Sequence, residues 1–340
     1  MILASIKWVE WLRLLIIAII ILLASVFGIM HFAEGAELLA TLQTGIWYWV
    51  IIAVMVQFLV IASRAGLYHA LYQFYNVPER LKRLFTLVLA SSFVGIITPG
   101  GSFTGTAVII YDAVHRGITF ARAVMINYVY YMLAYSAFFL VMVVGLTYLV
   151  WYGNLTVYSI IAALLLVALI GLQVGSIILA LRRPELLPKI AVSITWWLQP
   201  RVKKYFKKDI DEEKVISFAI GLVESVRLMA QHPRGLSSAT VNAFMIEFFN
   251  IATLWAVFKA FQYTVPLGNL IAGYSIGVLF MIISITPSGI GVVEPLMTAA
   301  FTSLGVPLET AALATYIYRG ISVWVPFLFG FFGLRIVKSD

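Results

Sequence analysis

Two short motifs of proline and glycine interrupt long apolar stretches of the sequence, Thr98-Pro99-Gly100-Gly101 and Thr286-Pro287-Ser288-Gly289. Because proline lacks a backbone donor and glycine weakens helical order, each motif is expected to end one helix and begin another. The N-termini that follow expose free N–H groups, which suit a phosphate or a carboxylate. The alternative is that both breaks are packing kinks. The candidate binding residues at the breaks are Thr98, Pro99, Gly100, Gly101, Ser102, Thr104, Thr106, Thr286, Pro287, Ser288, Gly289 and Gly291.

Four charged residues complete the candidate site: Asp112, Glu247, Glu294 and Arg319. Arg319 is placed roughly 15 Å into the last apolar stretch by the helical rise. Charges at such depth are costly and normally face a cavity or a partner. Glu294 and Arg319 therefore either pair with each other or bind a charged headgroup, and the two roles are compatible. Glu247 is a candidate to receive a proton or a substrate ammonium, and Asp112 lies nearer the end of its helix.

The two motifs belong to an internal repeat. One gapless offset aligns them, and it also pairs Tyr75 with Tyr263, Val77 with Val265, Pro78 with Pro266, Gly117 with Gly305, Ala123 with Ala311, Tyr128 with Tyr316, Tyr130 with Tyr318 and Gly145 with Gly333. Thr106 and Tyr131 of the first copy stand where the second has Glu294 and Arg319. An internal repeat in a membrane protein is typical of transporters.

The composition predicts an all-α integral membrane protein with a single membrane domain over residues 1–340. Hydrophobic residues make up 62% of the chain and charged residues 11%. Six stretches approach or exceed the roughly 20 residues that cross a bilayer: Leu14–Met30, Ile46–Ile61, Ala123–Val150, Val157–Leu181, Gly235–Phe261 and Thr310–Ile336. The pieces beside the breaks are too short to cross, so two re-entrant helical hairpins are expected: Leu84–Ile97 with Phe103–Arg116, and Leu267–Ile285 with Val292–Leu304.

The basic residues predict the orientation of these elements. With a cytoplasmic N-terminus, nearly all Lys and Arg fall on the cytoplasmic side, and we expect a multi-pass protein of the cell (plasma) membrane with both termini cytoplasmic. The outer loops hold no Lys or Arg: His31–Gly45, Tyr152–Thr156, Gln262–Pro266 and Gly305–Glu309. The hairpins then enter from opposite sides, which makes residues 14–150 and 157–336 an inverted-topology repeat. Such halves can exchange inward- and outward-facing forms.

Residues 182–234 are expected to form a cytoplasmic basic linker with an amphipathic helix at Ile210–Met229. Trp196 and Trp197 are typical interfacial anchors. A basic cluster is expected to contact anionic membrane lipids: Arg201, Lys203, Lys204, Lys207 and Lys208. The alternative is that this linker docks a lipid-synthesising enzyme. The net charge of +8 then reflects the topology of the chain rather than nucleic-acid binding. A homo-oligomer is also compatible with the sequence.

Several kinds of chemistry find no support in the sequence. The chain has no cysteine, which excludes disulfides and thiol chemistry. Its four histidines are scattered without metal-ligand spacing. Neither a Ser-His-Asp set nor a nucleotide-binding motif is present. We therefore expect no metal, no cofactor and no enzymatic activity.

The second motif extends to Gly291 and Glu294, and it is followed by Gly305-Val306-Pro307 and Tyr318-Arg319. Together these residues resemble the lysylphosphatidylglycerol synthetase transmembrane family, the flippase-like membrane domains, and the likeness covers nearly the whole chain. The resemblance implies movement of a lipid between leaflets, in the best-known members an aminoacylated phosphatidylglycerol. Those members carry a separate soluble synthase domain, and we expect this chain to lack it. Members of the family usually carry charged residues at the positions of Thr106 and Tyr131. This departure leaves other phospholipids and polyprenyl-linked sugars open as substrates.

The leading hypothesis is a lipid translocase that works by alternating access. A secondary transporter of a small polar solute would use the same architecture with a sealed central cavity. A membrane-embedded lipid-modifying enzyme is the third candidate, and it would gain support if Asp112, His115 and Glu247 formed one cluster. The fourth is an accessory subunit of a synthase complex that binds its partner through residues 182–234.

Overall fold

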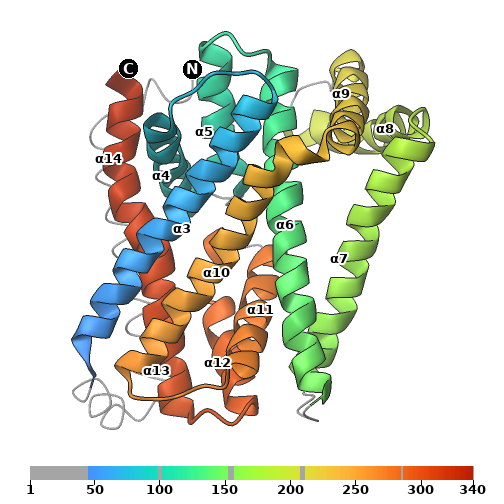
Figure 1. The fold of residues 1–340 in the computed structure, drawn as a ribbon. Helices are drawn as coiled ribbons and strands as arrows, with labels where there is room; N and C mark the ends of the chain where they lie inside the picture. Colours follow the sequence, from blue (N-terminus) through green and yellow to red (C-terminus); the bar gives the residue numbers. More distant parts are fainter. Residues whose placement is uncertain (1–44, 99–101, 152–156, 207–210, 285, 340) are drawn as a thin grey trace.

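The computed structural model describes residues 45–98, 102–151, 157–206, 211–284 and 286–339, which form an elongated bundle of helices (Figure 1). Among these residues, five helical segments are long and apolar enough to cross a membrane: Trp47–Phe74, Phe120–Trp151, Ala163–Arg182, Arg234–Ala260 and Leu308–Ile336. They match five of the six predicted spans, and the remaining prediction, Leu14–Met30, lies outside the described residues. The prediction of an all-helical protein with several spans is confirmed.

The helices before the linker follow the predicted breaks closely. They are α3 (Trp47–Phe74), α4 (Leu81–Ile97), α5 (Ser102–His115), α6 (Phe120–Trp151) and α7 (Val157–Arg182). The sequence placed the end of the first described span at Ile61, whereas α3 continues to Phe74. Arg64 lowers the local hydropathy, but arginine favours a helix almost as well as the apolar residues around it. The chain therefore stays helical past this charge.

The second part of the chain contains two linker helices and the second set of membrane helices. The elements are α8 (Leu186–Phe206), α9 (Glu212–Gln231), η1 (Pro233–Leu236), α10 (Ser237–Ala260), α11 (Leu267–Ile283), η2 (Pro287–Gly289), α12 (Val293–Ser303), α13 (Leu308–Arg319), η3 (Gly320–Trp324) and α14 (Val325–Ser339). The predicted span Thr310–Ile336 is thus two helices joined by η3, a π-helical turn. The predicted amphipathic helix corresponds to α9.

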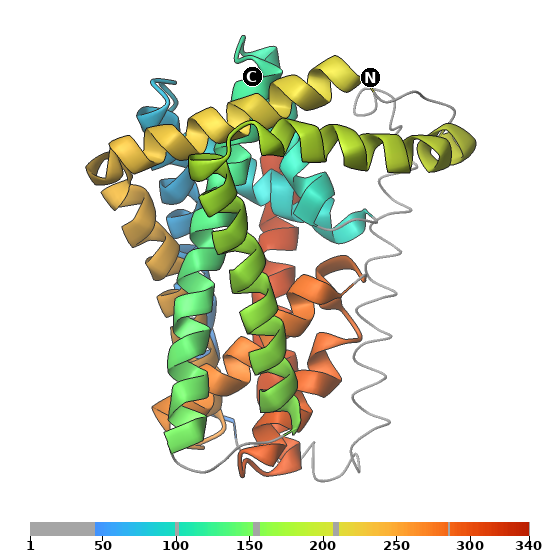
Figure 2. The same ribbon diagram turned by 90° about the vertical axis from the view of Figure 1, so that its right-hand side faces the viewer.

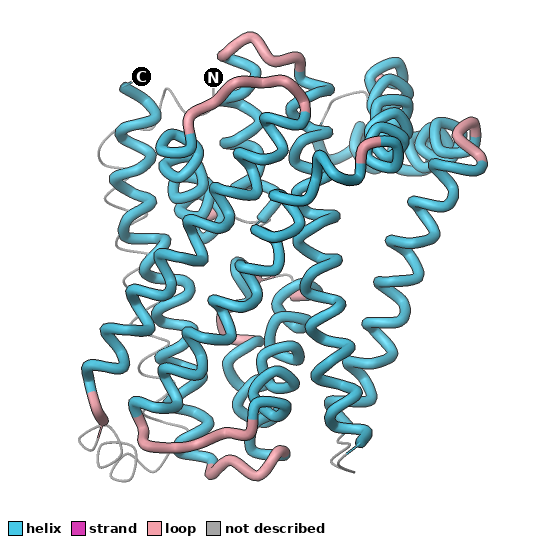
Figure 3. The backbone as a smooth tube through the Cα atoms, viewed as in Figure 1, coloured by secondary structure: helices cyan, strands magenta, loops and turns pink. Residues whose placement is uncertain are grey.

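The paired short helices lie in opposite halves of the bundle. In Figure 1, α4 and α5 lie in the upper half and α11 and α12 in the lower half. Helices α8 and α9 cross the upper end nearly at right angles to the long helices (Figure 2), and we call this end the α8–α9 end. Most loops gather at the two ends, with short breaks inside the bundle (Figure 3). The elements therefore place irregular backbone within an otherwise helical interior.

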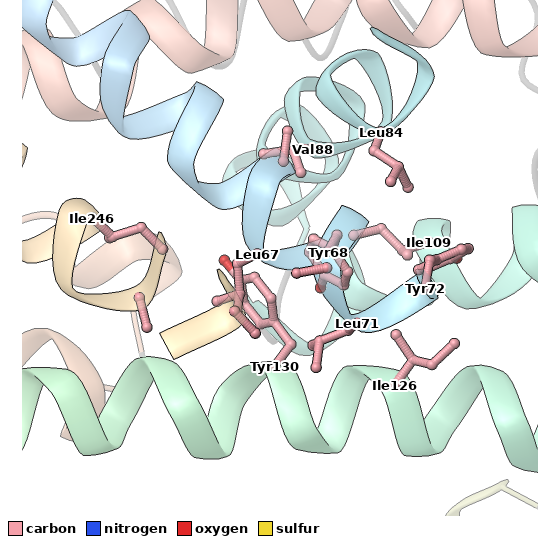
Figure 4. Close-up of a cluster of buried hydrophobic side chains, with 14 of the residues drawn as sticks. Leu67, Tyr68, Leu71, Tyr72, Leu84, Val88, Ile109, Ile126, Tyr130 and Ile246 are labelled. Carbon is pink, nitrogen blue, oxygen red and sulfur yellow. The ribbon is translucent and has the colours of Figure 1, made fainter. Parts of the chain in front are cut away.

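Helices α3 and α10 contribute to both of the two largest hydrophobic cores among the described residues. One core surrounds α3, α4 and α6, where Leu67 and Leu71 are fully buried and Tyr68 stacks on Tyr130 at a ring-centroid distance of 4.1 Å (Figure 4). The other lies around α10 to α13, where Phe258 packs edge-on against Phe301. Because α3 and α10 join both cores, their packing connects the two parts of the chain.

Two glycines that the repeat aligns allow the same kind of close packing. A Cβ added at Gly145 on α6 would lie 3.1 Å from backbone atoms of Ala272 on α11. One added at Gly333 on α14 would lie 3.0 Å from the carbonyl oxygen of Thr86 on α4. In each case the long helix that follows a pair of short helices packs against the first short helix of the other part. The two parts are therefore interlocked by equivalent contacts.

The α4–α14 contact predicts a large stability difference between two glycine substitutions. A Cβ at Gly330 would lie 2.3 Å from the carbonyl oxygen of Leu89, so Gly330→Ala forces the two backbones apart. We expect a loss of about 1 to 3 kcal/mol, measured as a lower melting temperature in detergent. Gly175→Ala is the matched control, because nothing lies within 4 Å there. Equal melting temperatures for the two variants would contradict this packing.

Candidate functional site

The second break is a tight reversal of the backbone inside the bundle. Ser288, Gly289 and Gly291 have φ values of +52°, +71° and +81°, a region in which glycine is favoured. The N–H of Gly289 donates to the carbonyl oxygen of Thr286 at 3.0 Å, and that of Val292 donates to Gly289 at 3.1 Å. These bonds close the turn but leave other backbone groups without a helical partner.

Arg319 and Glu294 supply those missing partners. Arg319 Nε donates to Glu294 Oε1 at 3.0 Å, and Arg319 Nη2 donates to the carbonyl oxygen of Ser288. Glu294 Oε2 accepts the N–H of Gly291 at 2.7 Å. Both side chains are buried, with relative exposures of 7% for Glu294 and 6% for Arg319. The ion pair therefore holds α12 and α13 together and satisfies backbone groups of the break.

Arg319 also stands at an irregularity of its own helix. It ends α13 and is followed directly by the π-helical turn Gly320–Trp324. Such turns are rare and are frequently found at functional sites. The break after α11 and the π turn after α13 are thus joined through one arginine side chain.

The first copy of the repeat has a neutral version of this contact. The hydroxyl groups of Thr106 and Tyr131, the repeat partners of Glu294 and Arg319, form a hydrogen bond of 2.6 Å. Thr98 and Thr104 bond to each other through their hydroxyl groups across the first break. Pro99, Gly100 and Gly101 lie outside the described residues, and Ser102 begins α5. In both copies, the helix after the break is tied to the same position of the helix that follows.

A second polar group lies between the two parts of the chain. Glu247 on α10 is buried, and the hydroxyl of Tyr274 on α11 donates to its Oε2 at 2.6 Å. Arg64 on α3 lies within electrostatic range of Glu247 and of five tyrosines from α3, α6, α11 and α13: Tyr68, Tyr130, Tyr131, Tyr274 and Tyr318. We call Arg64, Glu247 and these tyrosines the polar centre.

Arg64 and the tyrosines are the residues that sequence reasoning missed. The predicted span ends at Ile61, which places Arg64 on the cytoplasmic side together with most other basic residues. The signal in the sequence is the helical spacing of Ile61 and Tyr68 around Arg64. Both are buried in the structure, so the helix continues with Arg64 near its protein-facing side. No local signal distinguishes a tyrosine that faces the polar centre from one that only fills space.

Asp112 belongs to a network of charges at the α8–α9 end. Its Oδ1 lies 2.5 Å from Arg83 Nη2, and its Oδ2 lies 3.7 Å from Arg116 Nε. Arg83 also approaches Glu79 at 3.7 Å. His115, on the same helix, bonds through Nδ1 to the carbonyl oxygen of Tyr111. The structure therefore gives Asp112, His115 and Glu247 separate partners.

The linker helices carry the predicted interfacial residues. Trp196 and Trp197 are exposed, and Trp196 Nε1 donates to Glu212 Oε2 on α9 at 3.3 Å. The basic cluster is described in part: Arg201, Lys203 and Lys204 lie in α8, whereas Lys207 and Lys208 lie outside the described residues.

Comparison with known proteins gives a family and several relatives. The sequence model of the family described as lysylphosphatidylglycerol synthase TM region matches residues 11–330. A UPF0104 membrane protein of Methanocaldococcus jannaschii is 26% identical over 299 residues, which cover 86% of this chain and 85% of that relative. A UPF0104 membrane protein of Pyrococcus horikoshii is 26% identical over 157 residues, or 44% of this chain and 46% of that relative. The chain is thus similar to archaeal membrane proteins over most of its length.

The Glu294–Arg319 pair predicts strong coupling between two substitutions. Arg319→Ala leaves a buried carboxylate without its cation, and we expect a loss of about 3 to 5 kcal/mol. Glu294→Gln together with Arg319→Ala should cost clearly less than the sum of the single changes, because no charge is then left alone. Thermal unfolding in detergent measures all three variants. Tyr131→Phe is the control for the neutral pair, and we expect it to lower the free energy of unfolding by about 1 kcal/mol. Additive effects of the Glu294 and Arg319 substitutions would contradict the pairing.

The charge network at the α8–α9 end predicts unequal roles for its two arginines. Arg83 is nearly buried and pairs closely with Asp112, so Arg83→Gln removes the nearest cation from a buried carboxylate. Arg116 is 39% exposed at its side chain and more distant, and its loss should cost less than about 1 kcal/mol. Melting temperatures of the two variants test this order, and a larger effect of Arg116→Gln would overturn it.

Proposed function

Because the chain belongs to the lysylphosphatidylglycerol synthase transmembrane family, we propose that it moves a phospholipid between the two leaflets of the membrane by alternating access. An aminoacylated phosphatidylglycerol and a related lipid, including a polyprenyl-linked sugar, are the candidate substrates. The observation that carries this proposal is the polar centre, which is drawn from both parts of the chain and lies inside a bundle of apolar helices. Polar groups in such a place mark the path of a polar substrate.

We further propose that the two parts are an inverted-topology repeat in which α4–α5 and α11–α12 are re-entrant hairpins. Their placement in opposite halves of the bundle supports this (Figure 1). The equivalent packing of Gly145 and Gly333 supports it as well. A third support is that Thr106 bonds to Tyr131 just as Glu294 pairs with Arg319. Halves with inverted topology can exchange conformations and open a central site to each side in turn.

The proposed path keeps the headgroup inside the protein and the acyl chains in the membrane. The outward surface of the bundle is apolar, with Met55 on α3 and Leu164 and Leu172 on α7 largely exposed. The helix N-termini after Thr98 and Thr286 would bind the phosphate, and Glu247 would bind an ammonium group. Asp112 is a further carboxylate for the ammonium once Arg83 releases it, and Arg319 positions Glu294 against the break.

The distribution of charge supports a cytoplasmic α8–α9 end in the plasma membrane. Exposed basic residues gather there on several elements: Arg80, Lys82, Arg116, Arg122, Arg182 and Arg183. Basic residues favour the cytoplasmic side of spans. In this orientation α8 and α9 lie where they can contact anionic headgroups or a lipid-synthesising enzyme, and both termini are cytoplasmic.

A secondary transporter of a small polar solute is the second candidate function. The burial of Glu247, Glu294 and Arg319 favours it, because a solute site is closed to lipid. The enzyme hypothesis lacks this kind of support, since Asp112, His115 and Glu247 have separate partners.

Leaflet exchange in proteoliposomes tests the proposal. Fluorescent phospholipids with anionic, zwitterionic and aminoacylated headgroups are incorporated, and their accessibility to an external quencher is followed over time. We expect headgroup-dependent exchange, slowed at least about tenfold by Glu294→Gln or Arg319→Ala, because a charged contact of this kind contributes roughly 1.5 to 3 kcal/mol.

The controls remove equal charges outside the site, with Glu309→Gln matched to Glu294→Gln and Arg183→Ala matched to Arg319→Ala. Exchange should be unchanged in both, and all variants must show the wild-type elution profile in detergent. Absence of exchange for every lipid, with and without an ion gradient, would reject translocation of these phospholipids and favour a polyprenyl-linked carrier, then the solute transporter.

A further inference from the structure

Arg64 is a charge inside a membrane helix that forms no ion pair with the described residues, although the carboxylate of Glu247 lies within its electrostatic range. Arg64 lies on α3, about 15 Å along the helix from its end at Phe74. Among the described residues, no ion pair or hydrogen bond joins its guanidinium to another side chain. By contrast, Glu247, Glu294 and Arg319 all have bonded partners. An intramembrane charge without a bonded partner is costly. The packing of the described residues does not offset this cost for Arg64, which indicates another role for the side chain.

The surroundings of Arg64 lie at the contact between the two parts of the chain. Two residues further on, a Cβ added at Gly66 would lie 2.3 Å from Asn242 Oδ1, so α3 and α10 are in close contact there. Glu247 follows on α10, but its Oε2 already accepts the hydroxyl of Tyr274. Substrate sites of transporters built from repeats lie at such a contact.

A second polar group on α3 lacks a partner. Gln57 is 1% exposed, and its Oε1 accepts no hydrogen bond within the described structure. It precedes Arg64 by about two helical turns and so lies near the same face of the helix. A buried amide oxygen without a donor is unfavourable. Arg64 can donate to a ligand and Gln57 can accept from one, which is the pattern required by a group that carries both an anion and a hydroxyl or ammonium.

We propose that Arg64 binds the phosphate group of the transported molecule at the contact of α3 and α10, a second position on the path besides the helix N-termini. Gln57 accepts a hydrogen bond from the polar group attached to that phosphate. A phosphodiester carries one negative charge and two free oxygens, and a guanidinium can bond to both at once. The hydroxyls of Tyr68, Tyr131 and Tyr274 are bonded within the chain, so the tyrosines of the polar centre that can donate to the same oxygens are Tyr130 and Tyr318. That the phosphate belongs to a lipid rests on the proposed function, whereas the binding chemistry does not.

Equilibrium binding to the full-length protein in detergent micelles tests this inference. The ligands are short-chain phosphatidylglycerol, the matching diacylglycerol without phosphate, and inorganic phosphate. The proteins are wild type, Arg64→Gln, Arg64→Lys and Arg183→Gln, the last a matched control at an exposed arginine beyond α7. Binding is followed by thermophoresis, and the melting temperature is measured without ligand.

We expect wild type to bind phosphatidylglycerol at least about tenfold more tightly than diacylglycerol, since a charged hydrogen-bonded contact is worth that much. Arg64→Gln should abolish the difference, Arg64→Lys should retain part of it because lysine lacks the fork of donors, and Arg183→Gln should leave it intact. Without ligand, Arg64→Gln should melt at or above the wild-type temperature, because it removes an unpaired charge. A folded Arg64→Gln variant that keeps the full preference would overturn the inference.

Other results separate this inference from the proposed function. Inorganic phosphate that binds as tightly as phosphatidylglycerol, in a manner dependent on Arg64, would assign the site to a soluble phosphate compound and reject its lipid source. Binding that depends on Arg64 without leaflet exchange would reject lipid translocation and keep the phosphate site. Exchange that responds to Glu294→Gln, with neither exchange nor binding responding to Arg64→Gln, would reject the inference alone.

Discussion

The irregular backbone between α11 and α12 depends on the ion pair between Glu294 and Arg319. Inside a membrane, water is not available to free N–H and C=O groups, so an unwound segment persists only if the protein bonds to them. Arg319 bonds to the carbonyl oxygen of Ser288, and Glu294 accepts the N–H of Gly291. Each charge also neutralises the other at 3.0 Å. The break, the end of α13 and the π turn that follows it are therefore parts of one arrangement.

The two copies of the repeat share a backbone plan but differ in their chemistry. Thr106 and Tyr131 join the first break to α6 with a neutral hydrogen bond, where the second copy uses two charges. Breaking a neutral hydrogen bond costs less free energy than breaking a buried ion pair. The contact between α5 and α6 can therefore separate at a lower cost than the contact between α12 and α13. If the halves alternate, the two access states differ in energy before any substrate binds.

The sequence was most informative where a local signal determines the structure. Proline and glycine mark the breaks, so the ends of α4 at Ile97 and of α11 at Ile283 were predicted to within about two residues. The prediction that the span of α3 ends at Ile61 was wrong, because hydropathy treats Arg64 as a boundary although a helix tolerates arginine. The bond between Tyr274 and Glu247 joins different helices and depends on how they pack. The sequence identified Glu247 as a candidate but contained no signal for its partner.

Arg64 and Arg319 are arginines of the helical bundle with different surroundings. Arg319 meets a carboxylate and a backbone carbonyl, so its charge is neutralised by the chain and it stabilises one conformation. Arg64 has no such partner among the described residues and lies where α3 packs closely against α10. Its charge is therefore still able to favour an anion, and any anion bound there contacts a helix that contributes to both cores. Binding at that point can change the relative energy of the two halves. A charge that is already neutralised within one half has much less effect on that energy.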